Sequence, residues 1–162
     1  MIDVKMIGAQ ALRLSGYASL FDIRDLGGDI VRRGAFAAYL LKNTNRDSTP
    51  KLPMLFGHET KEPIGIWTRV VEDKTGLFVS GEIFLGTQTA DRLARLVKSG
   101  AISGLSIGYK PTRMRRLKAG RELLEIDLWE VSIVAFPMLR NARITQIDDP
   151  QISTEPPLRS IL

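Results

Sequence analysis

Apolar and polar residues alternate with a period of two along residues 11–21. The even-numbered positions from Leu12 to Leu20 are apolar or glycine, and most of the odd-numbered positions are polar. Alternation of this length is typical of a strand with one buried face. Runs rich in β-branched and aromatic residues predict further strands at 52–58, 63–71, 77–85, 102–110 and 123–136.

Turn-forming segments connect these predicted strands. Residues 63–71 and 77–85 are joined by 72–76 (EDKTG), which has the length and composition of a hairpin turn. A second turn is predicted at 118–121 (KAGR), inside a basic segment that follows the strand at 102–110. Hairpin links of this kind favour antiparallel pairing.

The spacing of apolar residues changes to that of a helix in two segments, 34–42 and 87–98. Thr87 and Thr89 are candidate N-caps for the second helix, and Gly100 is its expected stop. We therefore expect two short amphipathic helices beside the strands.

Six or seven strands with two short helices predict an α+β, mainly β fold. The expected architecture is a small antiparallel β-barrel or sandwich with peripheral helices. Residues 1–145 are expected to form this domain. Residues 146–162 are rich in proline and acidic side chains and are expected to be a disordered tail.

Composition limits the chemistry of the chain. It has no cysteine and one histidine, which excludes disulfides and thiolate metal sites and leaves zinc without its usual ligands. We expect no metal and no cofactor. No stretch approaches the roughly 18 apolar residues of a membrane span, so we expect no membrane partner and a protein that stays in the cytoplasm of the cell that makes it.

The formal net charge is +5, and part of this excess gathers at Arg113, Arg115, Arg116, Lys118 and Arg121. A basic surface can attract an acidic partner. This segment lacks the interleaved aromatic residues on which single-strand binders stack bases. The pattern therefore disfavours nucleic-acid binding.

Ser106 is the candidate nucleophile. Alternation along 104–108 (GLSIG) places it between two glycines on one face of the predicted strand, which leaves room around its hydroxyl. The same letters match the nucleophile elbow of α/β-hydrolases, but no histidine follows Ser106 in the chain. The structural alternative is a glycine- and serine-rich strand edge or bulge.

His58 is the candidate general base. It ends the predicted strand 52–58, where its ring would be partly exposed and able to titrate near neutral pH. A single histidine can equally be a solvated or structural residue. If the chain is a serine–histidine enzyme, however, His58 has to be its histidine.

Glu130 is the candidate orienting carboxylate. It falls on the apolar face of the predicted strand 123–136, together with Phe136, and a carboxylate there needs a partner. An imidazole N–H would satisfy it, and so would an arginine such as Arg140 or Arg143, or a bulge that turns it to water. Ser132, on the same face, is a rival nucleophile with less room than Ser106.

These residues lie in sequence blocks that resemble the prohead maturation proteases of tailed phages, a serine protease family related in fold to the herpesvirus capsid-maturation proteases. The resemblance covers about residues 12–143, with the blocks in family order. They are GYASLF (16–21), GAF (34–36), FGH (56–58), PIGIW (63–67), GLFV (76–79), GLSIGY (104–109) and IDLWEVSIV (126–134).

The resemblance implies a closed barrel and a serine endopeptidase with a Ser-His-Glu triad. His58 matches the family's base, Ser106 its nucleophile, and Glu130 the acidic third member. The implied substrates are the scaffold protein or the scaffolding segment of the major capsid protein. The implied location is the assembling procapsid in the cytoplasm of the bacterial host. The sequence leaves open whether activity depends on a homodimer, as in the herpesvirus relatives, or on confinement at high concentration inside the shell.

The segment after Pro137 departs from the family pattern. Arg140 and Arg143 are therefore weak candidates for the arginine that helps to bind the oxyanion in the herpesvirus relatives. The alternative function is a catalytically inactive capsid assembly factor with the same fold. A nucleic-acid-binding barrel that uses the arginine cluster is a third.

Overall fold

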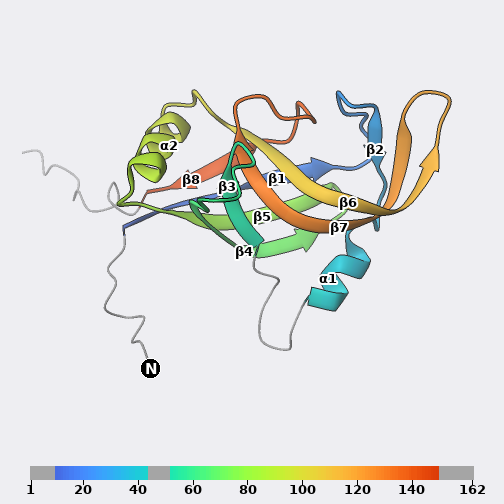
Figure 1. Ribbon diagram of the computed structural model, residues 1–162, viewed down its shortest axis with the longest axis horizontal. Coiled ribbons are helices and arrows are strands. Elements are labelled where there is room, and N and C mark those ends of the chain that lie inside the picture. The colour runs from blue at the N-terminus through green and yellow to red at the C-terminus, as the bar shows by residue number, and fades with distance from the viewer. Residues whose placement is uncertain (1–9, 44–51, 150–162) are drawn as a thin grey trace, which may run out of the picture.

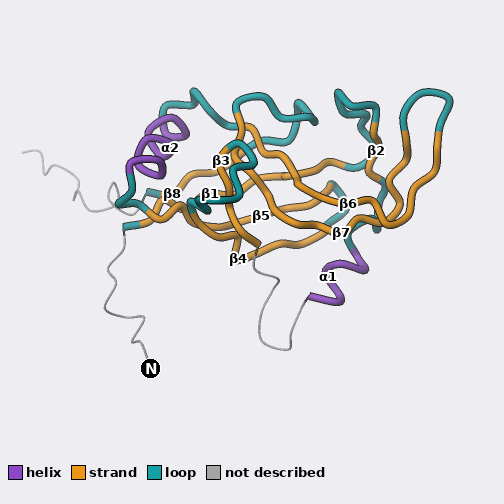
Figure 2. The backbone as a smooth tube through the Cα atoms, viewed as in Figure 1, coloured by secondary structure: helices purple, strands orange, loops and turns teal. Residues whose placement is uncertain are grey.

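Eight strands and two helices make up the described part of the computed structural model, residues 10–43 and 52–149. The predicted mainly β architecture is confirmed, and the helices lie near opposite ends of the sheet (Figure 1, Figure 2). The elements in chain order are β1 (Ala11–Leu20), β2 (Asp29–Val31), α1 (Ala37–Asn43), β3 (Leu52–Phe56), β4 (Gly65–Glu72), β5 (Gly76–Phe84), α2 (Gln88–Lys98), β6 (Gly104–Arg116), β7 (Arg121–Val134) and β8 (Ile144–Asp148).

The strands form one mixed sheet in the order β2-β7-β3-β4-β5-β1-β8, with β6 also paired to β7. The expectation of a wholly antiparallel sheet was wrong, because β2 and β3 both run parallel to β7. Neither strand is joined to β7 by a hairpin. A long connection through other elements leaves strand direction free, and sequence-local turns did not reveal these pairs.

The strand ladders do not close the sheet into the barrel that we expected. Between β6 and β1, the described residues supply only an isolated bridge, Gly104 to Arg143, and a few backbone hydrogen bonds. Leu105 N–H donates to the Ala142 carbonyl, and Tyr17 N–H donates to the Arg143 carbonyl. The connection between β7 and β8 consists mostly of turns and bends, so it provides contact at a few points instead of a continuous ladder.

The local predictions agree best with the structure. β4 and β5 form the predicted antiparallel hairpin. Thr87 is the N-cap of α2, and its hydroxyl accepts a hydrogen bond from Ala90 N–H, whereas Thr89 donates to Glu62. Gly100 follows the helix with a φ of 76°, a left-handed conformation that glycine adopts readily.

Three features differ from the sequence-based expectations. β2 and β8 were not predicted, and β8 extends past the expected domain boundary at residue 145. The rest of the predicted tail, from residue 150 on, lies outside the described residues. Phe136 lies beyond β7 and is 93% exposed, so it does not share the buried face with Glu130.

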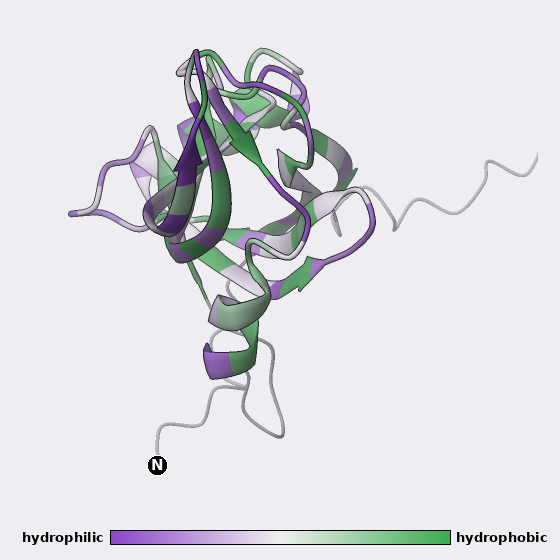
Figure 3. Cartoon of the chain, turned by 90° about the vertical axis from the view of Figure 1, so that its right-hand side faces the viewer, coloured by the Kyte–Doolittle hydropathy of each residue, from purple (hydrophilic) through white to green (hydrophobic). Residues whose placement is uncertain are grey.

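The core is built from the inward residues of the strands. Hydrophobic and hydrophilic residues alternate along them (Figure 3). Trp67 is fully buried and donates its indole N–H to the Val131 carbonyl at 2.9 Å. That bond ties β4 to β7 inside the core and fixes the strand that carries Glu130.

Candidate active site

His58 lies directly after β3, in a tight turn. Gly57 and His58 have φ values of 60° and 61°, both in the left-handed region. Gly57 N–H donates to the Ile133 carbonyl, and Glu59 N–H donates to the Phe56 carbonyl. A left-handed conformation costs a non-glycine residue roughly 1–2 kcal/mol, so the surrounding hydrogen bonds have to stabilise His58 in this position.

The imidazole of His58 contacts the carboxylate of Glu130. Nδ1 of His58 lies 2.5 Å from Oε1 of Glu130, and the side chains are 46% and 11% exposed. Ser132 donates its hydroxyl to the other carboxylate oxygen, Oε2, at 2.7 Å. The same hydroxyl oxygen accepts the backbone N–H of His58 at 3.0 Å. Both oxygens of the buried carboxylate are therefore satisfied.

Ser106 lies on β6, which pairs with β7 on the side opposite β3. The register places Ser106 across from Ser132 and Gly108 across from Glu130. Directly paired residues project from the same face of a sheet. Ser106 and the Ser132–Glu130 pair therefore share a face, and Ser106 is 7% exposed.

Gly108 makes room for the Glu130 carboxylate. A β-carbon at position 108 would overlap Oε1 and come within 2.8 Å of Cδ and Cγ of Glu130. A larger residue here would displace the carboxylate from His58. The glycine beside Ser106 thus has a definite structural role in the site.

The three candidate residues come from three adjacent strands. His58 follows β3, Glu130 is on β7, and Ser106 is on β6. The structure brings His58 and Glu130 into direct contact. Ser106 has no hydrogen bond to His58 among the described residues, and in proteins without bound substrate such contacts are often long and tighten in the substrate complex.

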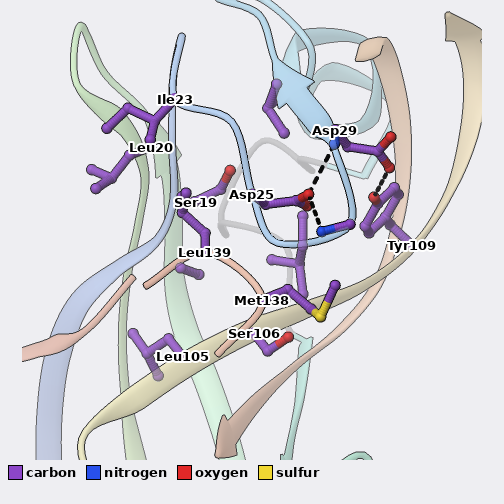
Figure 4. Close-up of a pocket in the computed structure, with 14 residues that line it drawn as sticks. Ser19, Leu20, Ile23, Asp25, Asp29, Leu105, Ser106, Tyr109, Met138 and Leu139 are labelled. Carbon is purple, nitrogen blue, oxygen red and sulfur yellow. Dashed lines mark hydrogen bonds between the residues drawn. The ribbon is translucent and has the colours of Figure 1, made fainter. Parts of the chain in front are cut away.

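A pocket of about 110 Å³ opens beside Ser106. Its apolar wall includes Leu20, Met138 and Leu139, and Ser106 and Asp25 are among its polar lining residues (Figure 4). His58 is not part of this lining. A substrate side chain could therefore enter beside the Ser106 hydroxyl without displacing the imidazole.

Two aspartates in the pocket lining, Asp25 and Asp29, accept several hydrogen bonds. Asp25 Oδ1 accepts the backbone N–H groups of Gly27 and Asp29, each at 2.8 Å. Arg121 donates to both oxygens of Asp29, at 2.8 and 2.6 Å, and Tyr109 donates to Oδ2 at 3.1 Å. The Arg121 hydrogen bonds hold the pKa of Asp29 below its usual value, and burial, followed by the charge of Asp29, raises the pKa of Tyr109.

The two arginines weighed as oxyanion donors differ in their contacts. Arg143 donates to the Arg140 carbonyl at 2.9 Å and to the Ser103 hydroxyl at 3.2 Å. The Arg140 residue is exposed. Neither arginine pairs with Glu130, whose partners are His58 and Ser132.

The sequence did not reveal that Ser132 forms hydrogen bonds with both His58 and Glu130. It is fully buried, so it has no access to a substrate and cannot be the rival nucleophile that its position on the same face as Glu130 had suggested. The spacing of two residues between Glu130 and Ser132 indicates only that their side chains lie on the same face of the strand. The hydrogen bond to His58 depends on the parallel pairing of β3 with β7, which that spacing does not show.

Several basic residues of the arginine cluster are engaged within the protein. Arg115 pairs with Glu122, Arg121 pairs with Asp29, and Arg113 lies 3.9 Å from Glu125. These contacts make part of the cluster structural.

The described ranges contain no group of three or more potential metal ligands and no helix long and apolar enough to cross a membrane.

Comparison with known proteins gives a family and a fold. A family model described as caudovirus prohead serine protease matches residues 1–154. The prohead protease of Enterobacteria phage HK97 is 35% identical over 133 residues, which cover 80% of this chain and 57% of that protein. The chain thus spans little more than half the length of this relative.

Among solved structures, the KSHV protease in complex with a hexapeptide phosphonate inhibitor superposes with a TM-score of 0.56. The sequence identity is 16%, and the match covers 83% of this chain and 64% of that one. At this identity the likeness concerns the fold alone.

Proposed function

The chain belongs to the caudovirus prohead serine protease family, and from this premise we propose that it is a serine endopeptidase in which Ser106 is the nucleophile, His58 the base and Glu130 the orienting carboxylate. The observation that carries the proposal is the contact between His58 and Glu130. Ser106 lies on the strand next to Glu130 and on the same face of the sheet. A serine needs both an imidazole base and a group that orients it.

In the acylation half of the reaction, Nε2 of His58 takes the hydroxyl proton as Ser106 Oγ bonds to the scissile carbonyl carbon. Glu130 stabilises the imidazolium that forms. The imidazolium then gives the proton to the leaving nitrogen, the C–N bond breaks, and the acyl group remains on Ser106 as an ester.

In the deacylation half, Nε2 of His58 takes a proton from water as the water oxygen attacks the ester carbon. The proton passes to Ser106 Oγ when the carboxylic acid product leaves. Backbone N–H groups near Ser106, or the loop with Arg140 and Arg143, supply the donors for the oxyanion of both tetrahedral intermediates.

The substrates in this proposal are the scaffold protein or the scaffolding segment of the major capsid protein. Cleavage takes place inside the assembling procapsid, in the cytoplasm of the bacterial host. Support comes from the family description, which names a prohead protease, and from the HK97 relative with the same name.

The test is co-expression of the full chain, or its Ser106→Ala variant, with the cognate capsid and scaffold proteins, followed by intact mass measurement of all three. We expect fragments with the wild type and a loss of cleavage of about 10⁴- to 10⁶-fold with Ser106→Ala or His58→Ala. Uncut partners in both samples, with shells assembled, would favour the inactive assembly factor instead.

A further inference from the structure

We propose that Ser132 is a positioning residue that fixes the tautomer and the backbone position of His58. The inference rests on the proposed function only where His58 is taken as the general base, since the contacts among Ser132, Glu130 and His58 do not depend on the activity of the chain. Ser132 is linked both to the backbone of His58 and, through Glu130, to its imidazole ring. Its hydroxyl oxygen accepts the His58 backbone N–H, and its proton goes to Glu130, which holds the His58 ring.

The direction of each of these three hydrogen bonds follows from the one that the His58 backbone N–H donates to Ser132. A backbone N–H can only donate, so Ser132 Oγ accepts from His58 at 3.0 Å. The hydroxyl proton is then directed to Glu130 Oε2, 2.7 Å away. The other oxygen of the Glu130 carboxylate, Oε1, can then accept a second hydrogen bond.

Glu130 Oε1 therefore accepts the proton on Nδ1 of His58, across 2.5 Å. This assigns the proton to Nδ1 and leaves Nε2 with a lone pair. Nε2 is then the atom that can take a proton from a nucleophile. Glu130 thus selects the tautomer of the imidazole, and Ser132 acts on that selection by holding the Glu130 carboxylate in place.

The hydroxyl of Ser132 also holds the backbone of His58. His58 has a φ of 61°, which side-chain-bearing residues rarely adopt. The hydrogen bond from its N–H to Ser132 and the bond from Gly57 N–H to the Ile133 carbonyl stabilise this conformation. Both acceptors lie on adjacent residues of β7, so this strand fixes the turn as well as the ring.

Water cannot replace the Ser132 hydroxyl without a rearrangement. Ser132 has no exposed surface, and Glu130 is 8% exposed. Loss of the hydroxyl would leave the His58 N–H and Glu130 Oε2 without their buried partner. Filling of core volume is the competing explanation for a buried serine, and it predicts no effect on the imidazole.

The single histidine of the chain makes the test direct. In the chain labelled with ¹⁵N-histidine, the imidazole nitrogen shifts and couplings report the tautomer of His58 without overlap. We expect the Nδ1–H tautomer in the wild type near neutral pH. In Ser132→Ala we expect a mixture of both tautomers.

The catalytic readout uses the cleavage products found by co-expression. We expect kcat of Ser132→Ala to fall about 10- to 100-fold with little change in KM, comparable to the loss of an outer partner of a metal-bound histidine. Val131→Ala is the matched control, because Val131 is the neighbouring buried residue of β7 and faces away from His58. We expect it to lower thermal stability and to leave the tautomer unchanged.

A variant of nearly the same size keeps the test informative if Ser132→Ala does not fold. Ser132→Cys offers only a weak donor, so we expect a partial shift toward the Nε2–H tautomer. A folded Ser132 variant in which His58 keeps the wild-type tautomer would overturn the inference. A wild type without protease activity, but with the expected tautomer change in the variants, would leave the inference intact and remove the proposed function.

Discussion

The two ends of β7 each bury a glutamate, but they give it different partners. Near the start of the strand, Glu122 is paired with Arg32 and Arg115. Near its end, Glu130 contacts His58 and Ser132. The two residues are 3% and 8% exposed, so burial alone does not distinguish them.

The partner decides what each carboxylate does. Arginine stays protonated at all ordinary pH values, so the Glu122 contacts are fixed ion pairs. The hydrogen bonds from Arg32 lower the pKa of Glu122. Histidine, unlike arginine, has an ordinary pKa near neutral, and the side chain of His58 is 46% exposed and contacts Glu130. The Glu122 ion pairs connect parts of the fold, whereas in the proposed mechanism Glu130 orients the imidazole that transfers the proton.

The strongest way to sharpen this comparison is Glu130→Gln beside Glu122→Gln. In Glu130→Gln the amide cannot stabilise an imidazolium, so we expect kcat to fall about 10²- to 10⁴-fold with a small change in melting temperature. In Glu122→Gln we expect the reverse, a clear loss of thermal stability and nearly full activity per folded molecule. Steady-state kinetics and thermal unfolding of both variants are the measurements.

Similar activity losses in the two glutamine variants would break the distinction between a structural and a catalytic carboxylate. So would a large drop in melting temperature for Glu130→Gln with its activity retained at low temperature.

A smaller effect is expected from Gly108→Ala. The new β-carbon overlaps Oε1 of Glu130, so the carboxylate has to move away from His58. We expect kcat to fall about 10- to 100-fold, since a displacement near 1 Å can cost about 10²-fold. If the variant acts through Glu130, it should add little when combined with Glu130→Gln. Full additivity in this double-mutant cycle would contradict the mechanism.

The smallest effect concerns acid stability at the arginine-paired end. Asp29 and Glu122 have pKa values below their usual range, chiefly because of hydrogen bonds from Arg121 and Arg32. A carboxylate with a lowered pKa contributes stability above its unfolded pKa, and that contribution is lost as the pH falls through its folded pKa. We expect the melting temperature to decline below about pH 4.

The substitution Asp29→Asn should lower the melting temperature at neutral pH by a few degrees and flatten its acid decline, because one titrating carboxylate is gone. Melting curves from neutral to acid pH, with wild type and variant side by side, measure both. An unchanged slope in the variant would show that the Asp29–Arg121 pair does not govern the acid transition.

Short-range patterns predicted most of the elements, and long-range pairing explains the differences. Thr87 and the β4–β5 hairpin were recognised because their hydrogen bonds join residues close in the chain. β2 has three residues and pairs in parallel with a strand about 90 residues later. No local pattern specifies such a pair, so neither β2 nor the mixed sheet could be foreseen.

The candidate site shows the same division. His58 was singled out because it is the only histidine, and Glu130 because alternation placed a charge on an apolar face. The register of β6 on β7 then explains why Ser106 and Gly108 lie opposite Ser132 and Glu130. That register is not visible in the sequence. The parallel pairing of β3 with β7, which brings Ser132 to the His58 backbone, is not visible either, so the sequence offers Ser132 only as a rival nucleophile with less room than Ser106.

Covalent labelling tests the central claim most directly. Procapsids assembled by co-expression with the full chain are treated with a peptidyl phosphonate ester, which reacts with an activated serine, and the modified residue is located by peptide mass spectrometry. The account predicts a single adduct on Ser106 that is lost in His58→Ala. An adduct on another serine, or equal labelling of Ser106 without His58, would contradict it.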